Sequence, residues 1–407
     1  MSSVIEPVRA RWSGLPPRVR QYAPAAVAIA LAGLYPFYVD VLPEAFPPVS
    51  IAVVMLIFVM MALGLNIVVG YAGLLDLGYV AFYAVGAYIA AWFASLHFDQ
   101  VTFHFGSVGV QDDAPGVHIS IWLVLIVAGI VTTVAGILIG LPTLRLRGDY
   151  LAIVTLGFGE IIPIFVLNSD EQGIGFDLTH GAFGINPIDS AGFGGLSAIG
   201  LPEVYRTAEN RAELYFWTAL ALLLFTVFCS VRLRDSRLGR AWIAIREDET
   251  AAAAMGVPLM RTKTWSYAMG AFFGGVAGAF YAVYKSGAFP SDFYFQFSVF
   301  LLCMVILGGM GSIWGVITGA LILSWLDREG LAKIGSWIGD ISGQQVDVPK
   351  YAFGIYGAII VVMMLLRPAG LIPERRHKIE LEEGVHDTPF YDVQTEGALT
   401  DRDPSDD

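Results

Sequence analysis

The chain has 407 residues, of which 56% are hydrophobic and only 15% are charged, and its mean hydropathy is +0.64. Average soluble domains carry about 25% charged residues, and the apolar residues here form uninterrupted runs of about 20, the length that crosses a bilayer. This composition excludes a water-soluble globular protein and predicts an all-α, polytopic membrane bundle.

The first 22 residues are basic and Pro-rich, without the apolar core or cleavage site of a signal peptide, so we expect a cytoplasmic lead. The apolar region 23–373 contains ten predicted membrane segments, at 23–42, 49–69, 73–96, 119–141, 150–167, 213–231, 265–284, 297–310, 312–326 and 351–366. The third and eighth are the weakest, because they are Gly-rich or short. Either one could be re-entrant or broken instead of a full span.

The basic residues predict the orientation, because cytoplasmic loops hold an excess of Lys and Arg. With the N-terminus inside, 18 of the 24 Lys and Arg residues fall in inner segments. The remaining six fall in outer loops: Arg206, Arg211, Lys285, Arg328, Lys333 and Lys350. Both termini and residues 232–263 are therefore expected in the cytoplasm.

Two acidic residues lie in predicted membrane segments. Glu160 is inside the fifth, where an unpaired carboxylate costs a few kcal/mol and is a functional hypothesis by default. Pro163 cannot donate to the carbonyl of Gly159, so it predicts a kink, and broken helices often form substrate paths. The alternative is that Glu160 only locks helices together. Asp76, near the inner end of the third segment, is a weaker candidate for the path.

The outer loop after the third segment holds His97, His104 and His118, with Asp112 and Asp113. Their spacing matches no standard metal motif, so no metal site is expected. Cys229 and Cys303 both lie in apolar segments and are expected to be core residues and not a disulfide.

A polar stretch, "GRAWIAIREDETAAAAMGV" (239–257), separates the sixth and seventh segments. Its composition predicts a helix over 243–255, with Gly256 as the stop and Pro258 after it. The alanines at 251–254 would present a thin surface to a partner groove, and the flanking charges would fix the register. Those charges are Arg246, Glu247, Asp248 and Glu249. The alternative is a loop helix that only caps its own bundle.

Glycines mark the later segments. Gly270, Gly274 and Gly278 recur every four residues, which leaves one helix face bare for close packing. Gly308 and Gly309, in "GGMGS", predict irregular backbone at membrane depth, which must be buried in protein or face a water-filled path.

The C-terminal residues 374–407 are predicted to be a disordered cytoplasmic tail. Residues 380–407 hold ten acidic residues and one basic residue, which is too polar to fold alone. No charge pattern indicates nucleic acid. The chain contains no GxxxxGK[ST], HExxH or GxSxG motif, so we expect a non-enzymatic protein without catalytic residues, metal or cofactor of its own.

Five motifs occur in order: "GLNIVVGYAGLLDLGYVAFYAVGAY" (64–88), "LPTLRLRGDYLAIVTLGFGEII" (141–162), "LGRAWIAIREDETAAAAMGV" (238–257), "VILGGMGSIWGVITGALIL" (305–323) and "RPAGLIP" (367–373). Together they resemble the larger, LivM-type permease of branched-chain amino acid ABC importers. The likeness covers roughly residues 50 to 373.

The resemblance identifies 239–257 with the coupling loop that such permeases present to their ATPases, whose pattern is Glu-Ala-Ala, three residues, then Gly. Here Glu249 stands seven residues before Gly256 instead of six. The coupling residues implied are Gly239, Arg240, Arg246, Glu247, Asp248, Glu249, Ala252, Ala253 and Gly256.

The resemblance also implies partners: a homologous LivH-type permease, two cytoplasmic ATPase subunits that hold ATP and Mg²⁺, and an extracytoplasmic substrate-binding protein. The assembly would lie among the lipids of a bacterial or archaeal cell membrane, the inner one where there are two.

Three stretches depart from the family pattern. "LTHGAFGI" (178–185) has His180 and Ala182 where relatives have Gly and Pro, "PSDF" (290–293) replaces a "PESF"-like stretch, and Phe297 replaces an acidic residue. All should face the side where substrate arrives. Two alternatives stay open: a urea or short-amide ABC permease, and a stand-alone ion-coupled transporter, which would need paired ionisable residues at the midplane and internal repeats.

Overall fold

The computed structural model describes residues 17–43, 46–106, 113–146, 148–191, 211–342 and 347–373. Most of the basic N-terminal lead, Asp112 and the acidic tail 374–407 lie outside the described residues.

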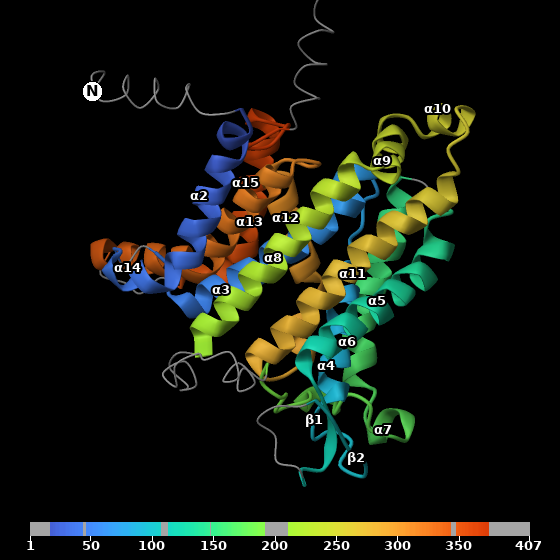
Figure 1. Ribbon diagram of the computed structural model, residues 1–407, viewed down its shortest axis with the longest axis vertical. Helices are drawn as coiled ribbons and strands as arrows, with labels where there is room; N and C mark the ends of the chain where they lie inside the picture. Colours follow the sequence, from blue (N-terminus) through green and yellow to red (C-terminus); the bar gives the residue numbers. More distant parts are fainter. Residues whose placement is uncertain are drawn as a thin grey trace, which may run out of the picture.

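Helices dominate the described part of the chain (Figure 1). The longer helices are α2 (Pro17–Tyr38), α3 (Val49–Asn66), α5 (Ile121–Thr143), α6 (Asp149–Leu167), α8 (Arg211–Asp235) and α11 (Leu259–Lys285). The shorter ones are α4 (Val80–Phe93), α7 (Glu171–Ile174), α9 (Arg237–Glu247), α10 (Glu249–Ala254), α12 (Phe295–Gly308), α13 (Ile313–Trp325), α14 (Leu331–Ser342) and α15 (Ala352–Leu366). Single turns are π-helical at η2 (Ile67–Tyr71) and η7 (Leu326–Gly330), and 3-10 at η1 (Val39–Val41), η3 (Gly181–Phe183), η6 (Pro290–Phe293) and η8 (Val348–Tyr351).

Six helical stretches within the described residues are long and apolar enough to cross a bilayer: Val49–Tyr71, Ile121–Thr143, Asp149–Leu167, Ala212–Asp235, Leu259–Lys285 and Val348–Leu366. The weak third and eighth predicted segments contain α4 and α12, of 14 residues each. At about 1.5 Å per residue, such a helix is roughly 21 Å long, short of a hydrocarbon core of about 30 Å. The chain is thus a helical membrane protein in which some segments do not span by helix length alone.

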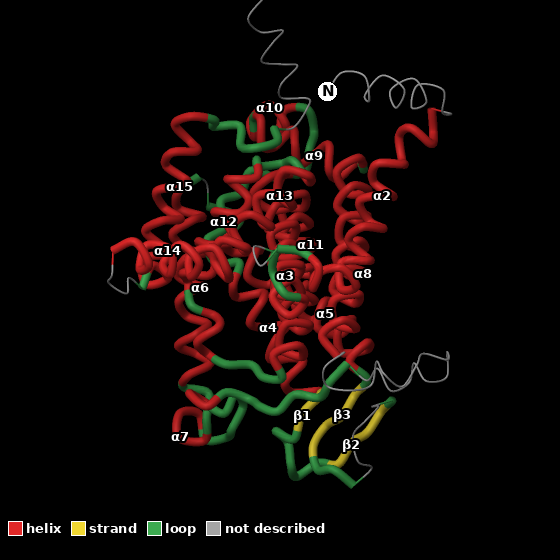
Figure 2. Tube along the Cα trace, turned by 90° about the vertical axis from the view of Figure 1, so that its left-hand side faces the viewer, coloured by secondary structure: helices red, strands yellow, loops and turns green. Residues whose placement is uncertain are grey.

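The two ends of the bundle differ (Figures 1 and 2). The start of α2, the helices α9 and α10 and the end of α15 lie at one end, which we call the α10 end. The strands and α7 lie at the opposite end, which we call the sheet end.

A small sheet corrects the all-α prediction. Strands β1 (Ala94–Ser95), β2 (Thr102–Phe105) and β3 (Gly116–Ile119) form a sheet in the order β1-β3-β2, with β1 antiparallel and β2 parallel to β3. These strands are too short to show an alternating apolar pattern in the sequence.

Helix α14 lies within residues 327–350, which the sequence places in an outer loop without predicting a helix there. The ninth predicted segment, 312–326, corresponds to α13, which has 13 residues and continues into the turn η7. After that turn α14 runs across the direction of the long helices (Figures 1 and 2).

Helix α11 forms the centre of the bundle, packing against α3, α4 and α5. Its predicted bare face is confirmed: a Cβ at Gly270 would meet Val68, one at Gly274 would meet Tyr79, and one at Gly278 would overlap the backbone of Tyr83. Small residues on α11 thus let the backbones of α3 and α4 approach closely.

The "GGMGS" turn has the irregular backbone that the sequence predicts. Gly309 has φ +115°, a backbone conformation that favours glycine, and the Gly311 N–H donates to Asn66 Oδ1 at 2.9 Å. The N–H groups of Leu371 and Ile372 donate to the carbonyls of Leu307 and Gly308. Gly308 and Gly309 are buried against "RPAGLIP", which is the first of the two predicted environments.

Candidate functional site

A cavity of about 420 Å³ lies between the first turns of α12, the turn η7 and α15, with further walls from α3, α4, α11 and η6. This volume falls in the usual range of small-molecule sites, about 300–1,000 Å³. Its lining residues are Phe58, Tyr83, Tyr281, Ser291, Asp292, Tyr294, Gln296, Phe297, Phe300, Asp327, Arg328, Phe353 and Tyr356.

Charged groups converge on this cavity from two turns. In η7, Asp327 Oδ1 accepts a hydrogen bond from the Tyr356 hydroxyl at 2.6 Å, and Asp327 Oδ2 lies 3.4 Å from Arg328 Nε. The Arg328 guanidinium lies 5.3 Å from the ring centroid of Phe58. In η6, Asp292 pairs with Lys285 at 2.6 Å. The Arg328 side chain is 38% exposed, so its remaining N–H donors can reach a bound anion.

Aromatic rings form the apolar wall. The Phe58 and Phe297 centroids are 5.2 Å apart, those of Tyr83 and Phe297 are 5.3 Å apart, and those of Phe300 and Tyr356 are 5.0 Å apart. These spacings are typical of edge-to-face and offset aromatic packing. A guanidinium, two carboxylates and an aromatic wall together suit a small zwitterion with an apolar side chain.

The residues predicted for the path do not line this cavity. Glu160 lies on α6 with an exposed side chain, and α6 extends through the buried Pro163, so the kink predicted there stays a prediction. Gly308 and Gly309 lie in the turn described above.

Asp76 is 2% exposed in the loop 72–79 between η2 and α4. Its Oδ1 accepts from the Gly78 N–H at 2.9 Å, and its Oδ2 has no partner among the described residues. The loop packs on α6, where the Leu77 N–H donates to Thr155 Oγ1 at 3.0 Å. Asp76 is therefore a buried loop residue outside the cavity.

Two stretches that depart from the family pattern contribute lining residues to the cavity: "PSDF" and Phe297. Asp327 and Arg328 directly follow an apolar run, but they were counted as an outer loop. This oppositely charged pair at the end of a short apolar run was the sequence feature that could have indicated the cavity.

The polar stretch 239–257 lies in two helices, α9 and α10, which corrects the single helix predicted over 243–255. The break is at Asp248, whose backbone is extended (φ −152°, ψ 109°). Its carboxylate caps α10 by accepting from the Thr250 and Ala251 N–H groups at 2.7 and 3.0 Å. The Ala251 bond, then the Thr250 bond, lowers the pKa of Asp248. Gly256 ends α10 with φ +86°, as predicted.

Buried contacts anchor this helix pair to the bundle. Trp242 is fully buried on α9, and its Nε1–H donates to the Thr262 carbonyl of α11 at 2.8 Å. Arg246 Nη1 donates to the Gly70 carbonyl of η2 at 2.6 Å. Glu249 pairs at 2.9 Å with Lys263, whose side chain is only 4% exposed.

Most of the predicted flanking charges are therefore engaged within the chain. Arg246, Asp248 and Glu249 hold the helix pair in place, whereas Glu247 is exposed. That all four also set the register on a partner stays a prediction.

At the start of the helix pair, the Ser236 hydroxyl accepts from the Gly239 N–H and caps α9. A Cβ at Gly239 would overlap the carbonyl of Leu233. Arg240 Nη1 donates to the Asp235 carbonyl at 2.9 Å. Both predicted residues thus shape the turn from α8 into α9.

The tip of the helix pair projects from the bundle. Ala252 is buried, whereas Ala251, Ala253 and Ala254 are exposed. Met255 is 85% exposed at the extreme tip. Three of the four alanines thus present a thin surface, and the fourth faces the chain itself.

The histidines of the sheet end separate into two groups. His118 is buried, its Nδ1 lies 2.7 Å from Asp189 Oδ2, and its ring lies 4.9 Å from that of His104. Burial raises the pKa of Asp189, and the hydrogen bond from His118 opposes this shift. His97 instead lies near Asp177 and His180. Asp113 is exposed.

The family model described as the branched-chain amino acid transport system / permease component matches residues 48–364. The chain belongs to this family. The resemblance inferred from the five motifs is thereby confirmed.

Relatives of two kinds match this permease. The chain is 36% identical over 384 residues to the high-affinity branched-chain amino acid transport system permease protein LivM of Escherichia coli K12. The aligned residues cover 90% of this chain and 78% of that protein. A probable branched-chain amino acid transport permease protein LivM of Methanocaldococcus jannaschii is 25% identical over 337 residues, 78% of this chain and 91% of the relative. The permease protein LivH of E. coli K12 is 27% identical over 182 residues, 44% of this chain and 53% of the relative. No solved structure matches the chain.

Proposed function

We propose that this chain is the non-catalytic permease subunit of an ATP-driven importer for branched-chain or similar apolar amino acids. Family membership over residues 48–364 supports the transport role. The observation that carries the substrate class is the cavity, which joins charged groups of both signs to an aromatic wall.

Each part of an amino acid has a counterpart in this cavity. Arg328 presents several donors to an α-carboxylate in the planar geometry that suits it. Asp292 and Asp327 present acceptors to an α-ammonium group. The rings of Phe58, Phe297 and the other aromatic residues receive an apolar side chain and exclude water. A urea or short-amide substrate carries no charge that would need the guanidinium.

The proposed topology has ten membrane segments, with α4, α12 and α13 as short or broken segments and both termini in the cytoplasm. Supporting this, the start of α2 and the end of α15 lie at the α10 end (Figure 1), and the inner segments assigned from the sequence hold 18 of the 24 basic residues. Cysteines placed at Ser236 and Ser190 should react with an impermeant thiol reagent from opposite faces. Labelling of both from one face would contradict this topology.

The coupling mechanism follows from the anchored helix pair. Two cytoplasmic ATPase subunits with ATP and Mg²⁺ would grip the tip at Ala253 and Met255 when they close. The pull would reach α11 through Trp242 and η2 through Arg246. A LivH-type permease would complete the path in the cell membrane, and an extracytoplasmic binding protein would deliver substrate at the sheet end.

The decisive experiment is uptake by the complex reconstituted in proteoliposomes with ATP inside. Arg328→Gln removes a charge-assisted hydrogen bond worth about 1.5–3 kcal/mol. The leucine concentration that gives half-maximal uptake should therefore rise roughly 10-fold to 100-fold. Lys350→Gln, which removes an exposed charge outside the cavity, is the matched control and should behave as wild type.

Three outcomes would refute the proposal. If Arg328→Gln keeps the wild-type affinity for leucine, the cavity is not on the transport path. Uptake of urea in preference to leucine would overturn the substrate class. Uptake that persists without ATPase subunits would favour an ion-coupled transporter.

A further inference from the structure

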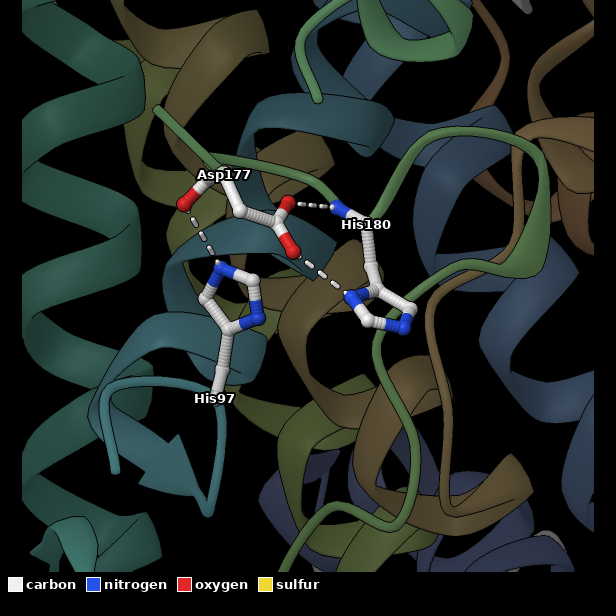
Figure 3. A group of neighbouring side chains, drawn as sticks. All are labelled: His97, Asp177 and His180. Carbon is white, nitrogen blue, oxygen red and sulfur yellow. Dashed lines mark hydrogen bonds and ion pairs between the residues drawn. The ribbon is translucent and has the colours of Figure 1, made fainter. Parts of the chain in front are cut away.

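A polar cluster at the sheet end shares no residue with the cavity or with α9 and α10. Figure 3 shows its three side chains. It joins His97, just after β1, to Asp177 and His180, in the segment between α7 and η3. One possible ligand atom from each of the three side chains lies within 4.8 Å of the other two. His97 is 80 residues from Asp177 in the chain, so the fold alone brings them together.

Asp177 organises the cluster. Its Oδ2 lies 2.7 Å from His180 Nδ1, and its Oδ1 accepts from the His180 backbone N–H, also at 2.7 Å. Its backbone carbonyl lies 3.2 Å from His97 Nε2. The His97 and His180 rings are nearly perpendicular, with centroids 6.2 Å apart.

The backbone of His180 is in the left-handed region, with φ 60° and ψ 20°. This conformation costs a non-glycine residue about 1–2 kcal/mol. Backbone strain of this kind clusters at functional sites, and the side chain here is an imidazole.

We propose that His97, Asp177 and His180 form a binding site for a divalent transition-metal ion of the Zn²⁺ class. Two imidazole nitrogens and one carboxylate oxygen are a ligand set that Zn²⁺ binds, with water completing a tetrahedron. Mg²⁺ and Ca²⁺ prefer sites made of oxygen ligands.

The geometry needs only side-chain adjustment. With metal–ligand bonds of about 2.0–2.2 Å, neighbouring ligand atoms in a tetrahedral site lie about 3.3–3.6 Å apart. The His180 and Asp177 atoms at 2.7 Å must separate slightly, and atoms as far apart as 4.8 Å must approach. The His180 and Asp177 side chains are 55% and 35% exposed, so an ion from solution can enter.

A bound ion would tie the segment after α4 to the segment after α6. Trp92 of α4 already donates from Nε1 to the Leu178 carbonyl at 2.7 Å, so these segments are in contact before any metal binds. A bound metal ion would strengthen this contact and restrain the ends of α4 and α6. The site does not depend on the proposed transport function, because binding itself is the measurement.

The test uses the full-length chain in detergent, purified without a polyhistidine tag and stripped of metal. Zn²⁺ is titrated by competition with a chelating dye. Wild type should show one saturable site, and His97→Gln and His180→Gly should each lower its affinity at least about tenfold, the scale seen when metal-site partners are lost. His104→Gln is the matched control, because this histidine lies in the same segment but bonds the Ala114 carbonyl.

Thermal unfolding distinguishes lost binding from misfolding. Glycine relieves the strain at position 180, so His180→Gly without metal should unfold at or above the wild-type temperature. Zn²⁺ should raise the midpoint of wild type and of His104→Gln but not of His180→Gly, because a ligand stabilises only the form that binds it. The proposal is overturned if wild type has no saturable site, if His180→Gly binds Zn²⁺ as tightly as wild type, or if His104→Gln loses binding equally.

Discussion

Trp242 offers the sharpest test of how the helix pair α9 and α10 is held on the bundle. Its side chain is fully buried between α9 and α11, and its indole N–H donates to the Thr262 carbonyl. Truncating a buried Trp to Ala typically costs about 3–5 kcal/mol. Trp242→Ala should therefore shift the equilibrium between docked and undocked α9 by about two to four orders of magnitude towards undocking.

The cost should fall on the helix pair and not on the whole bundle. Trp242 contacts the first turn of α11, at the α10 end of the bundle. The rest of α11 packs against α4 and α5 and does not depend on this contact. Trp242→Phe keeps most of the buried ring and loses the hydrogen bond, worth about 0.5–1.5 kcal/mol. This variant should stay mostly docked.

Hydrogen exchange followed by mass spectrometry can locate the effect. In Trp242→Ala, amides of 237–256 should exchange faster while those of α5 keep wild-type protection, and leucine uptake and ATPase stimulation should fall. Trp337→Ala removes a Trp that is 65% exposed on α14 and serves as the control. Wild-type protection of 237–256 in Trp242→Ala would refute the anchor, and loss of protection throughout would show that Trp242 supports the whole bundle.

Three further changes test other parts of the structure. Ala253→Trp adds a bulky ring at the exposed tip, where a clash with a partner costs about 1–3 kcal/mol. Membrane insertion should be unchanged, but co-purification of the ATPase subunits should fall by up to about 100-fold. Normal recovery of the ATPase subunits would argue against a contact there. Glu160→Gln changes an exposed side chain outside the cavity, so uptake should stay within about twofold of wild type; a large loss in an assembled complex would return Glu160 to the path. Gly278→Leu places side-chain atoms against the Tyr83 backbone and should lower the free energy of unfolding by more than about 1–3 kcal/mol. Gly354→Leu, at a position with open space around it, should leave the free energy of unfolding unchanged.

The sequence by itself determined the features that depend on local composition. Apolar runs predict membrane helices because an unpaired backbone in lipid is costly, and the order of five motifs identifies the family. The glycine face of α11 was also predictable, because residues four apart share one face of a helix. Gly256 as the end of α10 followed from its own conformational freedom.

Only the tertiary structure decided which polar groups meet. Glu160 was conspicuous in the sequence but is exposed and does not line the cavity, whereas Arg328, expected in a loop, lies over the ring of Phe58 from a distant helix. His97 and His180 meet in the same way, far apart in the chain. Periodicity shows that a residue lies on a helix, but the free energy of a charge depends on its neighbours, and those neighbours come from other helices.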